Sequence, residues 1–289
     1  MTKIQDPGPE TLRAATQGDL AALDTVINAI QGGVYNLAVR MLGQRDDAAD
    51  ATQEILLKVV THLATFRGEA AFTTWVFQIA KHHLLTASTK AREHPEQSLE
   101  AMAEKLQAGL DFAATRPGGE RVLTPEDKLA ARQVALGCTQ NMLMALDREQ
   151  RLVVVLDSVF ALPSKQAAEV LGLSAEAYRQ RLSRARARLD TFTSSTCGLA
   201  SDSAACRCER QLPALADAAA RGVRIDPPLA RTRRERDETE RQFGALLRLG
   251  DAASVLRAHP DYQAPDSMRQ AIRSVLQASG FWPEDRPLQ

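Results

Sequence analysis

Residues 162–189 have the sequence LPSKQAAEVLGLSAEAYRQRLSRARARL, which predicts two short helices joined by a tight turn. Gly172 stands where the first helix should end in a left-handed residue, and the hydroxyl of Ser174 can accept a free backbone N–H at the start of the second helix. Tyr178 and Leu182 share one face of that second helix. Its arginines fall largely outside this face: Arg179, Arg181, Arg184, Arg186 and Arg188. A short basic helix behind a turn is a form that the DNA major groove accepts.

The composition indicates a helical protein whose positive charge is local. The chain has 289 residues, of which 44% are hydrophobic and only 4% aromatic, and this favours helices over sheets. Lys+Arg and Asp+Glu are both 36, so the formal net charge is zero. A protein that holds DNA tightly by itself is usually basic, so we expect DNA binding to need a partner. The sequence contains no HExxH motif, phosphate-binding loop or catalytic-triad spacing, so we expect no enzymatic activity.

No apolar run is long enough to span a bilayer, and the first residues, MTKIQDPGPE, lack the apolar core of a signal peptide. We therefore expect a cytoplasmic protein that does not contact a membrane.

Apolar periodicity predicts an all-α fold with two helical domains, a linker and a helical C-terminal extension. The first domain should contain helices over about 11–42, broken near Gly32-Gly33, then 46–63 and 71–88. Pro and Gly weaken the helical pattern of the linker, which keeps one short helix near 99–112. Helices over 125–138, 141–146 and 149–160 should precede the helix-turn-helix. The predicted divisions are a disordered N-terminus over 1–10, a first domain over 11–90, a linker over 91–124, a second domain over 125–192 and a cysteine-containing extension over 193–289.

Four motifs occur in a fixed order along the chain. They are D-x-x-Q-E at 50–54, F-R-G-E at 66–69, F-x-T-W-x-F-x-I-A at 72–80 and G-L-S-x-x-x-Y-R-x-R-L-x-R-A-R at 172–186. In this order they resemble regions 2 and 4 of sigma-70-type factors of the extracytoplasmic-function (ECF) group, over about 11–90 and 125–192. The resemblance implies a protein that binds core RNA polymerase, at the β′ clamp helices and the β flap, and directs it to the −10 and −35 elements of promoter DNA. Neither enzymatic activity nor a required cofactor is implied.

The resemblance also implies roles for individual residues. Polymerase binding falls on Asp50, Gln53 and Glu54, which are neighbours on one helix. In the −10 region, Phe72, Val76 and Ile79 are expected in the core, whereas aromatic rings such as Trp75 can stack on unpaired bases at roughly 1–3 kcal/mol each. After Ala80 the chain departs from the family, whose segment reads R-N-x-x-x-D followed by several arginines. This chain has Lys81, His82 and Thr86 there, so the Asn and Asp are absent, and the basic run that follows is thin. Arg181, Arg186 and Arg188 should meet phosphates or water. The −10 candidates are Arg67, Trp75, Gln78, Lys81 and His82, and the −35 candidates are Lys165, Glu176, Arg179, Gln180, Ser183 and Arg184.

The extension contains Cys197, Cys206 and Cys208. Three thiolates are one ligand short of a closed zinc site, which Cys138, His259 or a water could complete. Oxidation of a thiol pair and plain free thiols are the alternatives.

The extension also resembles those of ECF factors that carry their own regulator in place of a separate anti-sigma factor. Two sets of apolar residues could pack on the sigma domains: Phe243, Leu246, Leu247 and Leu249, then Met268, Ile272, Val275 and Leu276. We therefore expect an autoregulated sigma factor, with an anti-sigma factor as the alternative regulator. The alternative for the whole chain is a helix-turn-helix regulator that binds DNA without polymerase.

Overall fold

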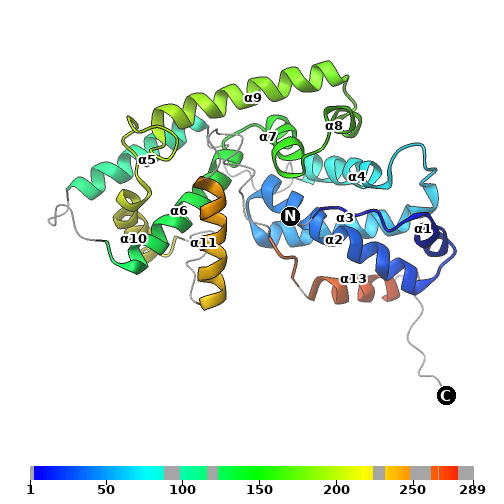
Figure 1. The fold of residues 1–289 in the computed structure, drawn as a ribbon. Helices are drawn as coiled ribbons and strands as arrows, with labels where there is room; N and C mark the ends of the chain where they lie inside the picture. The colour runs from blue at the N-terminus through cyan, green and yellow to red at the C-terminus, as the bar shows by residue number, and fades with distance from the viewer. Residues whose placement is uncertain are drawn as a thin grey trace. The chain divides into compact units, whose positions relative to one another are not determined.

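The computed structural model describes residues 3–87, 98–115, 123–223, 232–247, 262–265 and 267–278. Apart from one bridge between two residues, the regular structure of these ranges is helical (Figure 1). The chain divides into two compact units. The first comprises Met1–Glu93, Leu162–Ala177 and Asp261–Gln289, and the second comprises His94–Ala161 and Tyr178–Pro260. None of the helices in the described ranges is long and apolar enough to cross a membrane.

The first unit is built around one long apolar helix. Asp19 caps its start by accepting a hydrogen bond from the Ala22 N–H at 2.9 Å, and Gly43 ends it at φ 78°. Residues every three or four positions along this helix are fully buried, including Val26, Ile30 and Val34. The helices of the unit are α1 (Pro9–Thr16), α2 (Leu20–Leu42), α3 (Arg45–Thr61), the 3₁₀ turn η1 (Leu63–Thr65), α4 (Phe72–Ala87), α8 (Ser164–Leu171) and α13 (Ser267–Ala278).

Helix α2 continues through Gly32 and Gly33, where the sequence predicted a break. A Cβ atom on Gly33 would lie 2.5 Å from the backbone nitrogen of Ile4, so glycine is needed for the N-terminal segment to approach this closely. The N–H of Gln5 donates to the carbonyl of Ala29 at 2.9 Å, and Ile4 is only 7% exposed. The prediction of disorder over 1–10 is therefore wrong for the described residues from 3 onward, because they pack on α2 or begin α1.

The second unit contains the linker helix, most of the second sigma-like segment and most of the extension. Thr124 and Asp127 form a capping box at the start of α6, which is one continuous helix where the sequence predicted two. The short helix expected inside the linker is present as α5. Helix α10 packs against α5, and α11 packs against α6. The elements are α5 (Leu99–Ala114), α6 (Pro125–Met144), α7 (Arg148–Val154), the π-helical turn η2 (Val155–Val159), α9 (Ala175–Thr196, from residue 178 onward), η3 (Cys208–Gln211), α10 (Leu212–Ala220) and α11 (Arg233–Leu247).

Candidate polymerase and DNA interfaces

Helix α3 presents a polar face beside a buried one. The side chains of Asp50 and Glu54 are exposed and Gln53 is half-buried, while Thr52 and Ile55 are buried on the opposite side. The three residues predicted to bind polymerase therefore lie together and leave two carboxylates accessible to a partner.

A buried histidine lies next to this polar face. The Nζ of Lys58 lies 3.0 Å from the Nδ1 of His83, and the Oε2 of Glu54 lies 3.7 Å from the same nitrogen. Burial lowers the pKa of His83, and the positive charge of Lys58 lowers it further. The imidazole is therefore neutral near pH 7, and its Nδ1 can accept a hydrogen bond from the Lys58 ammonium.

Three aromatic rings meet at the start of α4. The ring centroid of Trp75 lies 5.4 Å from that of Phe66 and 5.9 Å from that of Phe72. Phe72 and Val76 are core residues, as predicted, whereas Ile79 is half-buried rather than buried. Because Trp75 is also half-buried, part of its ring is held by aromatic neighbours and part stays accessible.

The polar −10 candidates have different environments. Arg67 and His82 are exposed, while Gln78 and Lys81 are half-buried. The Nε2 of Gln78 donates to the backbone carbonyl of Glu169 at 3.3 Å, so this side chain is engaged by helix α8.

The packing of α8 on α4 within the first unit was not predicted from the sequence. The Nε2 of Gln166 donates to the hydroxyl of Thr74 at 3.1 Å, next to the contact between Gln78 and Glu169. Part of the predicted −10 surface is therefore covered by the first helix of the helix-turn-helix.

The turn between α8 and α9 has the predicted geometry. Gly172 ends α8 in the left-handed conformation at φ 71°, and the Ser174 hydroxyl accepts a hydrogen bond from the Ala177 N–H at 3.1 Å. All six −35 candidates are exposed: Lys165, Glu176, Arg179, Gln180, Ser183 and Arg184.

The other three arginines of α9 bind within the protein, where the sequence predicted phosphate or water. Arg181 pairs with Glu149 at 2.8 Å and Arg186 with Asp157 at 2.5 Å. Arg188 donates to the side chain of Gln150 at 2.8 Å. These contacts attach one side of α9 to α7 and η2, so the exposed arginines lie on the remaining surface.

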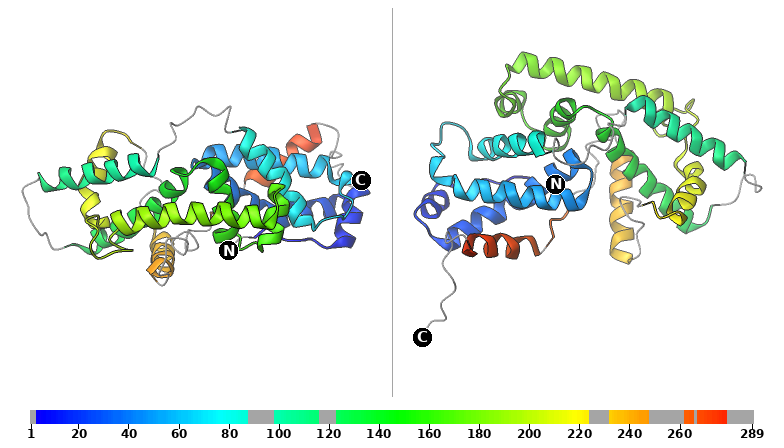
Figure 2. Two further views of the ribbon diagram at one scale, coloured as in Figure 1. Left: turned by 90° about the horizontal axis from the view of Figure 1, so that it is seen from above. Right: turned by 180° about the vertical axis from the view of Figure 1, so that it is seen from behind.

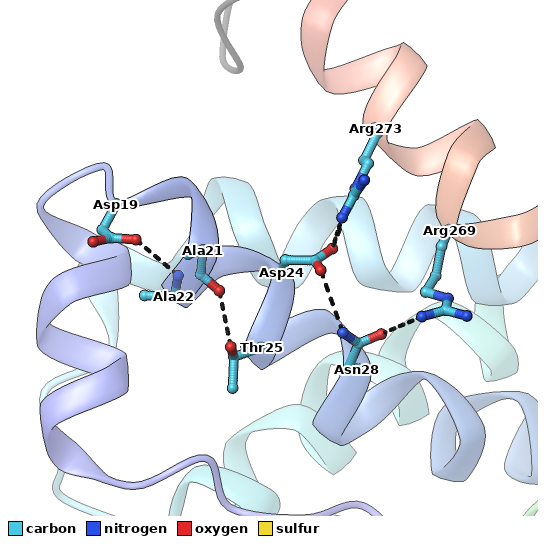
Figure 3. Close-up of polar contacts among 8 residues, drawn as sticks. All are labelled: Asp19, Ala21, Ala22, Asp24, Thr25, Asn28, Arg269 and Arg273. Atoms are coloured by element: carbon cyan, nitrogen blue, oxygen red, sulfur yellow. Dashed lines mark hydrogen bonds and ion pairs between the residues drawn. The ribbon is translucent and has the colours of Figure 1, made fainter. Parts of the chain in front are cut away.

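The last described helix of the extension, α13, packs on the first unit. Arg273 pairs with Asp24 of α2 at 2.7 Å, and Arg269 donates to Asn28 at 3.3 Å. Figure 3 shows both arginines pointing from α13 toward α2. The ribbon views place α13 alongside α2 and α3 (Figures 1 and 2), and its packing against α3 agrees with them. Its apolar seam consists of Met268, Ile272 and Leu276, all buried as predicted, whereas Val275 is 40% exposed.

A second contact fastens the extension just before α13. The side chain of Asn36 makes two hydrogen bonds to the backbone of Tyr262: its Nδ2 donates to the carbonyl at 2.6 Å and its Oδ1 accepts from the N–H at 2.7 Å. The guanidinium groups of Arg40 and Arg45 each lie 5.4 Å from the centre of the Tyr262 ring. A buried side-chain amide that bonds both polar groups of one residue holds that residue in a fixed register.

In the second unit the extension packs on α5 and α6. Glu240 of α11 forms an ion pair with Arg132 of α6, and the guanidinium of Arg132 lies 5.7 Å from the ring centre of Phe243. The Nε2 of Gln211 donates to the carbonyl of Leu106 at 2.8 Å. The side chains of Leu246 and Leu247, and residues Leu249 and His259, lie outside the described part of the chain.

No metal-binding group is seen at the cysteines in the described part of the chain. Over the described ranges, no three cysteine, histidine, aspartate or glutamate side chains are arranged to hold a metal ion, so nothing supports zinc at Cys197, Cys206 and Cys208. All four cysteines of the chain are free thiols.

The exposed acidic face of α3 suits a protein partner, and the exposed basic residues of the helix-turn-helix suit DNA. The family model for sigma-70 region 2 matches residues 26–93, and that for sigma-70 region 4 matches residues 136–189. The chain belongs to the sigma-70 family of RNA polymerase sigma factors, which direct transcription initiation and are not enzymes.

Its relatives are ECF sigma factors. The chain is 23% identical to the ECF RNA polymerase sigma factor SigW of Bacillus subtilis over 178 residues, which is 62% of this chain and 92% of that protein. It is 28% identical to the ECF RNA polymerase sigma factor SigM of Mycobacterium tuberculosis over 180 residues, 62% of this chain and 81% of the relative. It is 27% identical to the ECF RNA polymerase sigma-E factor of Haemophilus influenzae over 177 residues, 60% of this chain and 88% of the relative. The extension after region 4 lies beyond the family matches.

Proposed function

We propose that this ECF sigma factor is autoregulated by its C-terminal extension, which restrains region 2 until polymerase and promoter DNA are engaged. The observation that carries the proposal is the attachment of Tyr262 and α13 to region 2 through Asn36, Asp24 and a buried apolar seam. A segment held this specifically can change how readily region 2 meets its partners. A separate anti-sigma factor is then not needed for restraint.

The polymerase contact falls on Asp50, Gln53 and Glu54. Exposed carboxylates suit a reversible interface, because charge complementarity sets the orientation and rate of association. The partner surfaces are the β′ clamp helices for region 2 and the β flap for region 4. The described extension leaves Asp50 and Glu54 exposed, so restraint by α13 acts on the packing of region 2 rather than by covering these carboxylates.

The −10 element is bound by the α4 surface and the loop before it. Trp75 offers a partly free ring for base stacking, and Arg67, Lys81 and His82 offer polar and cationic groups. Gln78 can join them only after α8 has left α4, because its amide donates to the backbone carbonyl of Glu169 in α8.

The −35 element is bound by the exposed face of α9. Arg179 and Arg184 can donate two hydrogen bonds each to guanine, and Glu176 can accept from a cytosine amine. Gln180 and Ser183 lie on the same exposed surface, and Lys165 reaches the DNA backbone. We place this activity in the cytoplasm, where the polymerase works.

The test compares two substitutions on one helix in the full-length protein. Ile272→Asp puts a carboxylate into the fully buried seam of α13, while Val275→Asp adds the same charge at a position that is 40% exposed. We expect Ile272→Asp to raise promoter-directed transcription when core polymerase is limiting. Val275→Asp should give the same amount of transcript as the unsubstituted protein. Equal transcription from all three proteins, with hydrogen exchange showing α13 released in Ile272→Asp, would refute autoregulation by α13.

A further inference from the structure

The end of α9 and the loop that follows it bring two cysteines together. Cys197 and Cys206 form an isolated parallel β-bridge, and the N–H of Gly198 donates to the carbonyl of Cys206 at 2.9 Å. The N–H groups of Ala200 and Ser201 both donate to the carbonyl of Cys197 at 3.0 Å. The loop between the two cysteines is therefore closed by backbone hydrogen bonds and not by the thiols.

The bridge gives the two cysteines the separation that a disulfide needs. Neighbouring backbones in a β-bridge lie about 4.8 Å apart. Disulfides form across Cα–Cα separations of roughly 4.4–6.8 Å, so this pair can be joined without moving the backbone far. Both thiols are free in the structure.

The four thiols are neighbours, and the β-bridge singles out Cys197 and Cys206 among them. Cys197 is half-buried, and Leu199 and Ala200, which follow it by two and three residues, are exposed, so a small oxidant can approach from that side. The Sγ of Cys206 accepts a hydrogen bond from the Nε2 of Gln211 at 3.5 Å. Burial raises the pKa of Cys208 to about 12 and also raises the pKa values of Cys138 and Cys206, so none of these three thiols ionises readily at neutral pH.

We propose that Cys197 and Cys206 are an oxidation site that forms a reversible intramolecular disulfide when the protein meets a peroxide. The Cys197 thiolate attacks one peroxide oxygen, the O–O bond breaks, and Cys197 becomes a sulfenic acid while the other oxygen leaves as water. The Cys206 thiol then attacks the Cys197 sulfur, the S–O bond breaks and a second water leaves. Two thiols lose two electrons and two protons in total, and the peroxide is reduced to two waters.

The bond would join the C-terminal end of α9 to the segment that leads into η3. Since η3 packs on α5 and α6, oxidation would fix the junction between region 4 and the extension. This inference does not depend on the docking of α13, because all its contacts lie in the second unit.

The experiment treats the full-length reduced protein with hydrogen peroxide, blocks remaining thiols by alkylation and digests with trypsin. Cleavage after Arg188 and Arg207 releases both cysteines on one peptide, 189–207, without Cys208. We expect this peptide to become two hydrogen masses lighter and to resist alkylation, while Cys138 and Cys208 are alkylated. A dithiol reductant should restore both thiols. Because burial raises the pKa of Cys206, the step in which its thiol attacks the sulfenic acid should keep accelerating as the pH rises above about 8.5, the ordinary pKa of a free thiol.

Variants provide the controls. Cys197→Ser and Cys206→Ser should each abolish the lighter peptide, whereas Cys208→Ser should leave it unchanged. Three results would each overturn the proposal. The first is a bond between Cys206 and Cys208, and the second is a bond between two chains. The third is that all four thiols resist oxidation because the purified protein holds a stoichiometric metal ion.

Discussion

Replacing Ile272 by alanine should release α13 from region 2 without unfolding the rest of the first unit. Ile272 is fully buried in the apolar seam of α13, which packs against α3, whereas Val275 on the same helix is 40% exposed. The substitution removes three carbon atoms from a packed site and leaves a cavity, which costs about 2–5 kcal/mol.

This cost falls on the docking equilibrium of α13, because the helix is held by one short seam and a few polar contacts. A loss of at least 2 kcal/mol corresponds to roughly 30-fold more of the undocked state. Hydrogen exchange followed by mass spectrometry measures that population directly. Amide protection over 267–278 should fall by roughly 30-fold or more in Ile272→Ala, while protection in the middle of α2 stays unchanged.

Val275→Ala is the matched control, since it shortens an apolar side chain on the same helix outside the seam. We expect its exchange to stay within a few-fold of the unsubstituted protein. Equal protection in both variants would refute the reasoning, because it would mean that burial at Ile272 does not hold the extension on region 2.

Three further perturbations test other parts of the structure. Asn36→Ala removes both hydrogen bonds to the Tyr262 backbone, and at about 0.5–1.5 kcal/mol per bond it should speed amide exchange at that residue roughly fivefold or more. The pKa of His83 is lowered in the folded state, so the unfolded chain binds more protons than the folded one as the pH falls below about 6.5, and the protein becomes less stable there. His83→Gln should therefore lose less Tm between pH 7 and pH 5 than the unsubstituted protein. Arg179→Ala should weaken −35 binding by about 1–3 kcal/mol, or roughly 5- to 150-fold, with an unchanged Tm, whereas Arg186→Ala should lower the Tm because it leaves Asp157 without its ion-pair partner. Two assays separate the last two outcomes: binding of holoenzyme to promoter variants, and thermal unfolding of the free protein. A lower Tm for Arg179→Ala would contradict its placement on the exposed face of α9.

Local signals predicted local structure well. The hydrogen bond of Ser174 and the left-handed Gly172 act within a few residues, so the helix-turn-helix could be predicted from spacing alone. The ECF motifs likewise placed the exposed carboxylates of α3 on one face. The apolar face expected on the last helix of the extension is buried at three of its positions, Met268, Ile272 and Leu276.

Contacts between distant parts of the sequence were not predictable in the same way. Arg186 was expected to meet DNA or water, but its partner Asp157 lies 29 residues earlier, and sequence charge alone does not say which carboxylate a helix will meet. Asn36 and Tyr262 are 226 residues apart, and nothing in the periodicity of α2 shows that a buried amide will bind a backbone from the extension. Gly33 was expected to break a helix, whereas the structure uses its missing side chain to admit Ile4. In each case the missing information was which segment packs against the residue.

The measurement that tests the central claim most directly is transcription from fragmented genomic DNA of the source organism, using purified core polymerase with and without this protein. Mapping the 5′ ends of the transcripts identifies the start sites whatever the promoter sequence is. The account predicts start sites that require the protein and share two upstream sequence elements, and it predicts that Arg179→Ala loses preference only at the upstream one. A protein that binds DNA by itself but yields no such transcripts with core polymerase would contradict the account and would identify the chain as a regulator that acts without polymerase.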